Sequence, residues 1–533
     1  MRLSLEGIRD PAFVEKGYLM PAFDVKAMRA RSIAHPAWVH LGAGNIFRAF
    51  PAVLCQKLLN EGAWDKGISV VECYDEEILS DAFAPYDNLC VAVSLKRDGT
   101  AQKRVVASVA EALSYTADIA RVREIFCAQS LQMVTLTITE KGYAVTDALG
   151  APLPFCAGDF MRTEAPTSII GRLAALLYLR YQKNAAPLAL VSMDNCSRNG
   201  TVLRNAILKI ASAWRARDLV EEGFIDYLTD EQRVSFPWTM IDKITPRPDE
   251  SVLSLLQADG LSGIGVTATQ KNTFVSAMVN AEESEYLAIE DSFPAGRPPL
   301  EKTGVLFGDR SAVERIENMK VCTCLNPLHT ALAIFGCLLR FGRISDEMRD
   351  HTLAALARQL GYAEGLPVAA ETRLMSARAF LDEVVEKRLP NPFMPDTPQR
   401  IACDTSKKLS VRFGETLKKY VKSGRSDLSF LTFIPLVFAG YARYLTGVAD
   451  DGLPFFPSPD PNLSLLKGRL EGYRLGQPFD TDKLYTLFSD ASVFGVDLYK
   501  VNLGKKAERM FAEMNRGPGS IRRYLDHCVG NAK

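Results

Sequence analysis

The sequence predicts an α/β protein, in which a parallel sheet covered by helices is followed by a mostly helical C-terminal domain. Three observations lead to this prediction. A short apolar strand runs through a GxG turn into a helix, β-branched runs then alternate with helical patterns, and the apolar period becomes 3.6 after about residue 300. At 533 residues the chain exceeds what one hydrophobic core usually supports. We therefore expect two domains, 1–300 and 301–533.

The elements of the first domain follow from these patterns in order. MRLSLEGIRDPAFVEKGY is expected to form an extended arm, and AWVHLGAGNIFRAFPAVLCQKLLN reads as strand, glycine turn and amphipathic helix. GISVVECYD supplies a second β-branched run, and further strands are predicted at LCVAVSL, QMVTLTIT and LALVSMDN. Helical patterns such as DIARVREIFCAQ and IIGRLAALLYLRYQKN separate them. This alternation is typical of a parallel sheet with helices on both faces.

The second domain begins after EDSFPAGRPPLEKTG, a stretch rich in proline and glycine. Helices are predicted at HTALAIFGCLLRF, DHTLAALARQLGY, RLMSARAFLDEVVEKRL and KGRLEGYRL. The N-terminus has no apolar core of a signal peptide, and the most apolar stretch, LSFLTFIPLVFAGYARYL, is interrupted by Pro435 and Arg443. Neither a signal peptide nor a membrane span is expected, and we predict a cytoplasmic protein.

Composition narrows the function classes. The 63 basic and 63 acidic side chains cancel, which argues against a nucleic-acid partner or attachment to an anionic membrane. Eleven cysteines lie mostly in apolar surroundings, and the five histidines form no HxxxH pair. We expect reduced, buried thiols and chemistry without a metal, acting on a small molecule.

The glycine turn is the first candidate site. Gly42 and Gly44 follow a strand and open a helix, where backbone N–H groups can approach a pyrophosphate. Phe47 replaces the third glycine of GxGxxG, and GxG is also an ordinary tight turn. Arg48, one turn into the helix, is expected to reach a phosphate. Asn45 and Phe47 belong to the same predicted cofactor segment.

Two acids at the end of the next strand strengthen this interpretation. Glu72 and Asp75 occupy the region where a carboxylate accepts hydrogen bonds from ribose hydroxyls. Such a carboxylate would repel a 2′-phosphate, so NAD is expected rather than NADP. The alternative, in which both acids are a solvated strand end, stays open.

The stretch KVCTCLNPLHTALAIFG (320–336) is the second candidate site, because polar side chains precede a strongly apolar run. Burial makes the proton of a lysine easier to remove, which is one way a lysine becomes an acid/base catalyst. Structural roles are the alternative. Asn195 suits a turn or helix cap, His329 a buried core position, Asp242 a surface ion pair with Lys243, and Arg388 the end of a helix.

Seven segments in order resemble one family, the long-chain polyol dehydrogenases of the mannitol dehydrogenase type. They are HLGAGNIFRAF, YDNLCVAVSLK, TITEKGY, SMDNCSRNG, FPWTMIDKITP, ENMKVCTCLNPLHTALAIFG and RLPNPFMPDT. The resemblance implies a Rossmann-type N-terminal domain, a helical C-terminal domain, and metal-independent hydride transfer between NAD and a secondary alcohol. The arm, the turn and the long C-terminal domain look more like the mannonate-oxidising branch, so reduction of D-fructuronate is the expected activity. Mannitol 2-dehydrogenase or tagaturonate reductase activity and a non-catalytic nicotinamide sensor stay open, as does the oligomeric state.

The resemblance also implies roles for individual residues. Lys320 would be the general acid/base, and the amides of Asn195 and Asn326 would hold the reacting oxygen. The implied sugar-binding residues are Asp242, His329, Arg388 and Lys408. Glu317 and Glu140 would relay protons.

One spacing departs from the family pattern KxxxxNxxH, because five residues separate Lys320 from Asn326. On an ideal helix one extra residue turns a side chain by about 100°. Pro327 suits a first helical turn, and the β-branched Val321 and Thr323 make the preceding stretch a poor helix. We therefore expect an irregular segment or a π-bulge at Lys320.

Overall fold

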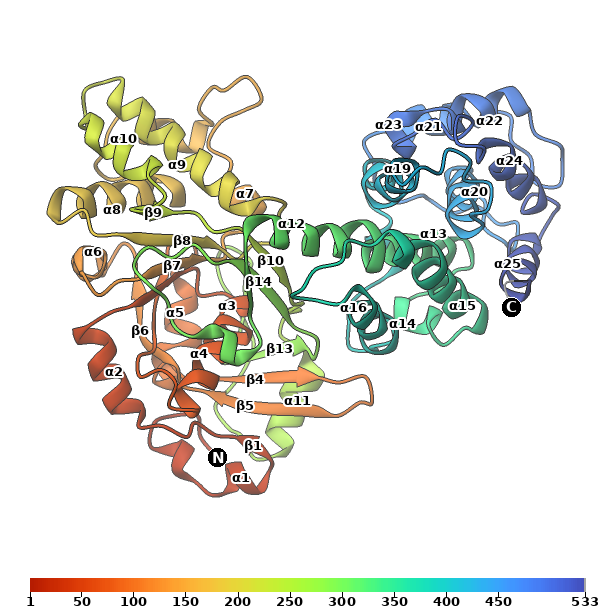
Figure 1. The fold of residues 1–533 in the computed structure, drawn as a ribbon. Coiled ribbons are helices and arrows are strands. Elements are labelled where there is room, and N and C mark those ends of the chain that lie inside the picture. The colour runs from red at the N-terminus through yellow and green to blue at the C-terminus, as the bar shows by residue number, and fades with distance from the viewer. Residues whose placement is uncertain (532–533) are drawn as a thin grey trace. The chain divides into compact units, whose positions relative to one another are not determined.

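The computed structural model describes residues 1–531 (Figure 1). The chain forms two compact units, the first of residues 1–96 and 100–314 and the second of residues 97–99 and those from 315 onwards. The division falls inside helix α12 (Arg310–Met319).

The first unit is built on a six-stranded sheet, β6-β3-β2-β7-β8-β9, in which every neighbouring pair is parallel. Its strands are β2 (Trp38–Leu41), β3 (Ile68–Glu72), β6 (Val109–Ser114), β7 (Met133–Leu136), β8 (Leu188–Ser192) and β9 (Val234–Ser235). Numbered along the chain, the order is 3-2-1-4-5-6, which is typical of dinucleotide-binding sheets. The predicted α/β fold is confirmed, and the order reverses between β2 and β7, where such sheets bind ligands.

Helices cover this sheet on both sides (Figure 1). Those of the first unit are α1 (Ala12–Glu15), α2 (Val25–Ala34), α3 (Asn45–Ala49), α4 (Pro51–Asn60), α5 (Glu77–Ala82), α6 (Ile119–Cys127), α7 (Thr139–Gly142), α8 (Ile169–Lys183), α9 (Asn199–Arg215), α10 (Glu222–Thr229) and α11 (Glu250–Ala258). The helix predicted after the glycine turn is divided into α3 and α4. The break at Phe50 precedes Pro51, which disfavours helical geometry in the residue before it.

LCVAVSL is a strand, as predicted, but it lies outside the parallel sheet. It forms β4 (Cys90–Leu95) of a second sheet, β1-β5-β4-β13, with β1 (Tyr18–Leu19), β5 (Ala101–Val106) and β13 (Met278–Glu282). β4 and β5 form an antiparallel hairpin, so β4 does not belong to the parallel strands that alternate with helices. Smaller sheets contain β10 (Thr239–Asp242), β14 (Tyr286–Glu290) and β15 (Leu306–Gly308), and β11 (Thr267–Ala268) with β12 (Phe274–Val275).

The prediction of an extended arm at the N-terminus is wrong. This segment contains a 3-10 turn (Gly7–Arg9), α1 and β1, and β1 pairs in parallel with β5. Phe13 is fully buried and meets the Tyr18 ring edge-on, with centroids 5.2 Å apart. Apolar side chains of the arm therefore fold into the first unit.

The second unit is helical. Its α-helices are α13 (Asn326–Leu338), α14 (Ile344–Glu347), α15 (His351–Gln359), α16 (Ala377–Glu383), α17 (Pro398–Ile401), α18 (Thr405–Leu409), α19 (Glu415–Lys422), α20 (Phe433–Leu445), α21 (Leu463–Gly468), α22 (Thr481–Phe488), α23 (Ala491–Phe494), α24 (Gly504–Glu513) and α25 (Ser520–Gly530). At the α13–α20 contact Gly440 leaves room for the Phe335 ring, 2.6 Å from where a Cβ would lie. KGRLEGYRL was predicted to be helical, but beyond residue 468 it forms turns, with Gly472 at φ +83°.

Four π-helical segments occur in the described part of this unit: η5 (Lys320–Cys324), η6 (Leu360–Gly365), η8 (Val384–Arg388) and η9 (Ser410–Gly414). The irregularity predicted at Lys320 is thus a π-helix, and α13 starts directly before Pro327. Both η6 and η9 pack against η5. A Cβ on Gly365 would lie 2.7 Å from the Thr323 carbonyl, and the Thr416 hydroxyl donates to the Cys322 carbonyl.

One helical run among residues 1–531, Arg310–Leu338, is long and apolar enough to cross a bilayer. Its most apolar 18-residue window is 89% buried within the protein, and a core helix meets the same criterion in this way.

Candidate functional site

The glycine turn lies at the carboxyl end of β2, beside the point where the strand order reverses. Gly42 has φ +104°, and a Cβ there would lie 2.6 Å from the Thr137 carbonyl, so glycine is required twice over. Gly44 is extended and precedes α3, and within residues 1–531 no atom beyond its own local backbone lies within 4 Å of the place its Cβ would occupy. The backbone at Gly44 is therefore open to close approach by a pyrophosphate, as the predicted cofactor requires.

A buried histidine on β2, His40, supports the glycine turn. His40 on β2 contacts Thr135 through Nδ1 (2.7 Å) and Thr137 through Nε2 (2.9 Å). Burial lowers the pKa of His40 to about 3, so the ring is neutral at physiological pH. Phe47 stacks on this ring with centroids 4.5 Å apart and is fully buried. Phe47 was predicted to be a cofactor contact, but it is a core residue, and sequence analysis missed His40.

Arg48 also lies elsewhere than expected. The side chain is fully buried, its Nη1 donates to the Ser276 carbonyl, and its Nη2 donates to the Asn45 side chain at 2.8 Å. Because α3 packs against β13 and β4, the arginine points into the fold. In this structure Arg48 holds Asn45, the first residue of α3, in position.

Glu72, the last residue of β3, and Asp75, three residues later, are both buried, which rules out a solvated strand end. Glu72 accepts a hydrogen bond from the backbone N–H of Ala43 (2.7 Å) through Oε2. Its Oε1 accepts from the N–H groups of three consecutive residues, Cys73, Tyr74 and Asp75. Asp75 in turn accepts from the Thr269 hydroxyl at 2.7 Å. Glu72 therefore ties the glycine turn to the loop that follows β3.

Asp194 joins two of the motifs noted in the sequence, TITEKGY and SMDNCSRNG. Its carboxylate accepts hydrogen bonds from the N–H groups of Ile138 and Thr139, both at 2.9 Å, and from the Tyr143 hydroxyl at 2.6 Å. Burial raises the pKa of Asp194, and burial beside Asp194 raises the pKa of Tyr143 well above its usual value. Thr139 has φ +64°, an outlier for a β-branched residue. The hydrogen bonds to Asp194 thus stabilise a strained turn at Thr139.

Two predicted functional residues next to this hydrogen-bonded group, Glu140 and Asn195, are exposed. Glu140 follows Thr139 on α7, and Asn195 follows Asp194 after β8. Asp194 consequently connects the backbone of the two segments that carry them.

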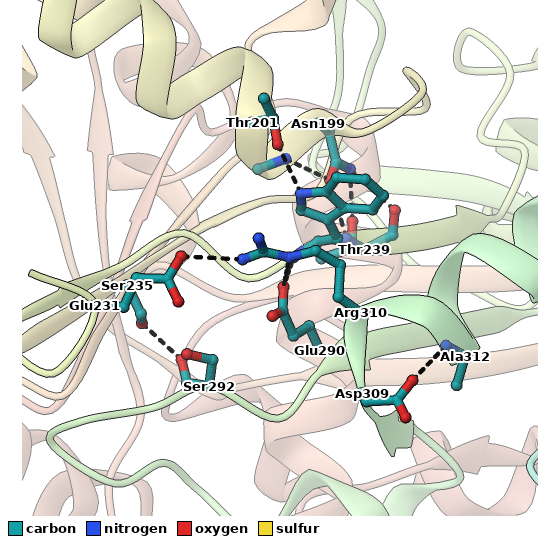
Figure 2. Close-up of polar contacts among 12 residues, drawn as sticks. Asn199, Thr201, Glu231, Ser235, Thr239, Glu290, Ser292, Asp309, Arg310 and Ala312 are labelled. Carbon is teal, nitrogen blue, oxygen red and sulfur yellow. Dashed lines mark hydrogen bonds and ion pairs between the residues drawn. The ribbon is translucent and has the colours of Figure 1, made fainter. Parts of the chain in front are cut away.

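A second cluster connects SMDNCSRNG to FPWTMIDKITP (Figure 2). The buried Asn199 amide donates to the Thr239 hydroxyl (2.7 Å), and its oxygen accepts from the Thr239 N–H (2.9 Å). A Cβ on Gly200 would lie 2.3 Å from the Phe236 carbonyl, so the glycine permits this contact. Thr239 begins β10, which ends at the buried Asp242. The network therefore sets the position of the strand that carries Asp242.

Figure 2 also shows how α12 begins on this cluster. Arg310 pairs with Glu290 (3.0 Å) and Glu231 (3.4 Å), and its guanidinium lies over the Trp238 ring. Asp309 accepts a hydrogen bond from the Ala312 N–H at 2.6 Å, which satisfies one donor of the first turn. The start of the helix that leads to Lys320 is thus anchored in the first unit.

In the second unit, Lys320, Asn326 and His329 lie along one continuous segment. Lys320 is 4% exposed and begins η5, while Leu325 leaves helical geometry at φ −122° and ψ −63°. His329, one turn into α13, is buried with its Nε2 3.6 Å from the Asp396 carboxylate, which also pairs with Arg400. The additional residue before Asn326 is accommodated by the π-helix.

The two predicted sugar-binding cations differ. Arg388 ends η8 and is buried, and it stays a candidate. The Lys408 ammonium donates to the carbonyls of Ile401 (3.1 Å) and Cys403, and burial, reinforced by nearby Arg412, lowers its pKa. This bonding occupies two of its three donors at the end of α17. Glu317 lies partly exposed on α12, three residues before Lys320.

Arg412 is a residue that sequence analysis missed. Its Nη1 donates to the Asn326 carbonyl (3.3 Å) and to the Thr330 hydroxyl (2.6 Å). The signal was its spacing, since a cation four residues after Lys408 lies on the same helical face.

Comparison with known proteins gives concordant results. The mannitol dehydrogenase Rossmann domain matches residues 36–302, and the mannitol dehydrogenase C-terminal domain matches residues 312–505. A D-mannonate oxidoreductase of Thermotoga maritima is 46% identical, with 99% of each chain covered. A mannitol 2-dehydrogenase of Cereibacter sphaeroides is 30% identical over 84% of this chain and 87% of the relative.

Two solved structures resemble the whole chain. A D-sorbitol dehydrogenase in substrate-free form is 25% identical, with a TM-score of 0.80 and coverage of 98% of this chain and 99% of that one. The ternary complex of Pseudomonas fluorescens mannitol 2-dehydrogenase with NAD and D-mannitol is 25% identical, with a TM-score of 0.69 and coverage of 99% and 100%.

Proposed function

Because the chain belongs to the mannitol dehydrogenase family, we propose that it interconverts D-mannonate and D-fructuronate. It is an NAD-dependent oxidoreductase acting on CH–OH groups. The observation that supports the choice of substrate is the 46% identity to a D-mannonate oxidoreductase over 99% of both chains, against 30% for a mannitol 2-dehydrogenase. A cytoplasmic location is part of this proposal.

Reduction of a ketone needs a hydride on carbon and a proton on oxygen, and bound NADH supplies the hydride. In this proposal the Lys320 ammonium gives its proton to the developing alkoxide and, in the reverse direction, the neutral amine takes the proton of the hydroxyl. The burial of Lys320 and its place in a π-helix support this role. The amides of Asn195 and Asn326 stabilise charge on the oxygen without titrating themselves.

The remaining predicted residues have supporting roles in the same proposal. Asp242, His329 and Arg388, all buried, line the sugar-binding site, and Lys408 supports them. Glu317 and Glu140 exchange the proton with solvent, which their partial or full exposure permits. The Gly42–Gly44 turn, with Asn45, Glu72 and Asp75 around it, receives the dinucleotide.

Substrate choice is tested by NADH oxidation with D-fructuronate, D-tagaturonate, D-fructose and fructose 6-phosphate at matched concentrations. We expect the highest kcat/KM with D-fructuronate and NAD⁺-dependent oxidation of D-mannonate. A higher kcat/KM with D-fructose would instead support mannitol 2-dehydrogenase activity. NADH binding without turnover of any of the four would support a sensor.

The role of Lys320 is tested by Lys320→Ala, with Lys422→Ala, an exposed lysine of α19, as the matched control. Turnover should fall by roughly 10²- to 10⁴-fold, the usual effect of losing a general acid/base. NADH affinity should be retained, because the glycine turn belongs to the other unit, and a small primary amine should restore part of the rate. Near-normal turnover of Lys320→Ala would refute the assignment.

A further inference from the structure

Arg412 lies where a substrate acid could be recognised. It belongs to η9, which packs against η5, the segment that carries Lys320. One nitrogen, Nη1, bridges the Asn326 carbonyl and the Thr330 hydroxyl, the two residues that flank His329 in the first turn of α13. Arg412 is therefore held against the turn that carries two of the proposed site residues.

The guanidinium of Arg412 has no carboxylate partner among the described residues. The side chain is partly buried, and burial lowers the pKa of its guanidinium to about 10. Within residues 1–531 no carboxylate pairs with it, and Nε and Nη2 make no hydrogen bond to the protein. Two other cations of this unit differ, because Arg400 pairs with Asp396 and the Lys408 ammonium donates to two carbonyls. A partly desolvated cation with two unused donor nitrogens is suited to an anion.

We propose that Arg412 selects an acidic substrate, with Nε and Nη2 donating side by side to the carboxylate of a ketose acid while Nη1 holds the first turn of α13. This inference rests on the proposed function, because it assigns the acid of that substrate to a named residue. A neutral ketose or polyol would leave the same guanidinium without an ionic partner. Arg412 therefore discriminates between a uronate and a neutral sugar. An arginine that only held α13 in place would not discriminate between them.

The test compares Arg412→Gln and Arg412→Lys with Arg425→Gln, which changes an exposed arginine of the same unit. The kcat/KM ratio of D-fructuronate to D-fructose should fall by about 10- to 100-fold in Arg412→Gln, since hydrogen bonds to charged groups are the stronger kind. This ratio should fall less in Arg412→Lys, because lysine keeps the positive charge but lacks the planar guanidinium that binds a carboxylate through two parallel hydrogen bonds. An equal fall in kcat/KM on both substrates in Arg412→Gln would overturn the inference, and Arg412 would then only hold α13 in place.

A binding measurement separates this inference from the proposed function. With NAD⁺ present, D-mannonate should raise the melting temperature of the wild type and of Arg425→Gln, and this shift should be smaller in Arg412→Gln. The shift caused by D-mannitol should not change. If D-fructuronate is not reduced but mannonate binding still depends on Arg412, the proposed function fails and the inference stands. If D-fructuronate is reduced and the mannonate shift is the same in all variants, the inference fails alone.

Should Arg412→Gln not fold, as judged by circular dichroism, Arg412→Lys decides the result. A selective loss on the uronate supports the inference, and an equal loss or no loss on either substrate overturns it.

Discussion

His40 should make the first unit sensitive to acid. Its pKa is about 3 in the folded protein, against about 6.5 in an unfolded chain, because burial disfavours the charged ring. Folding thus opposes protonation, so the stabilisation is fully present above about pH 6.5 and is lost as the pH falls towards 3. At about 1.36 kcal/mol per pH unit, the loss is about 2.7 kcal/mol at pH 4.5, and it levels off at about 4.4 kcal/mol near pH 3, where the folded ring also takes up a proton.

The perturbation is His40→Asn, which keeps a polar atom near Thr135 but cannot titrate. Its stability at pH 7.5 should be lower, because the stacking on Phe47 is lost. Between pH 6.5 and 4.5, however, the variant should lose up to about 1.36 kcal/mol less per pH unit than the wild type. NADH affinity of the folded wild type should not change through His40 over the same range, because the ring stays neutral in the folded protein.

The assay is unfolding by urea at several pH values, followed by a probe in the first unit, with His351→Asn as an exposed-histidine control. Carbon-13 labelling of the histidine rings provides a direct check, because the His40 signal should not titrate above pH 4.5. Equal pH slopes for wild type and His40→Asn, or a His40 signal that titrates near pH 6.5, would refute the reasoning.

Three further predictions concern single residues. Glu347 is fully buried, and burial raises its pKa well above the usual value, so stability is lost as the pH rises above about 4.5, where the unfolded carboxyl ionises. Glu347→Gln should therefore gain melting temperature relative to the wild type between pH 4.5 and 7.5, and a pH-independent difference would contradict this. Gly42→Ala places a Cβ 2.6 Å from the Thr137 carbonyl at φ +104° and should weaken NADH binding by at least tenfold, measured by fluorescence titration; unchanged affinity would show that the turn is not the cofactor site. Gly365→Ala should displace η6 from the Thr323 carbonyl and lower kcat more than NADH affinity, whereas an unaltered kcat would show that Lys320 does not depend on this packing.

Much of the fold was predictable because its signals are local. The strand, turn and helix around Gly42, the alternation that produces β7 and β8, and the irregularity at Lys320 all follow from the properties of adjacent residues. Proline at 327 and β-branched residues before it are sufficient to interrupt a helix, whatever packs against them.

Elements that depend on distant partners were less predictable. The pattern of β4 identifies a strand, but its sheet is decided by pairing with β5 and β13, the latter almost 200 residues later in the sequence. The arm becomes ordered because Phe13 and Tyr18 find buried positions on the first unit, and KGRLEGYRL has a helical composition that tertiary structure overrides.

For the candidate site, the order of residues along the chain specifies which chemical groups are present: a glycine turn, acids at the end of the next strand, and a lysine, an asparagine and a histidine ahead of an apolar helix. How each group is used depends on the folded arrangement around it. Arg48 and Phe47 point into the core, and Glu72 is bonded to four backbone N–H groups. Arg412 keeps two donor nitrogens unused among the residues that the structure describes. The reason is that a side chain's hydrogen bonds and solvation depend on neighbours brought together by folding, which spacing along the chain does not specify.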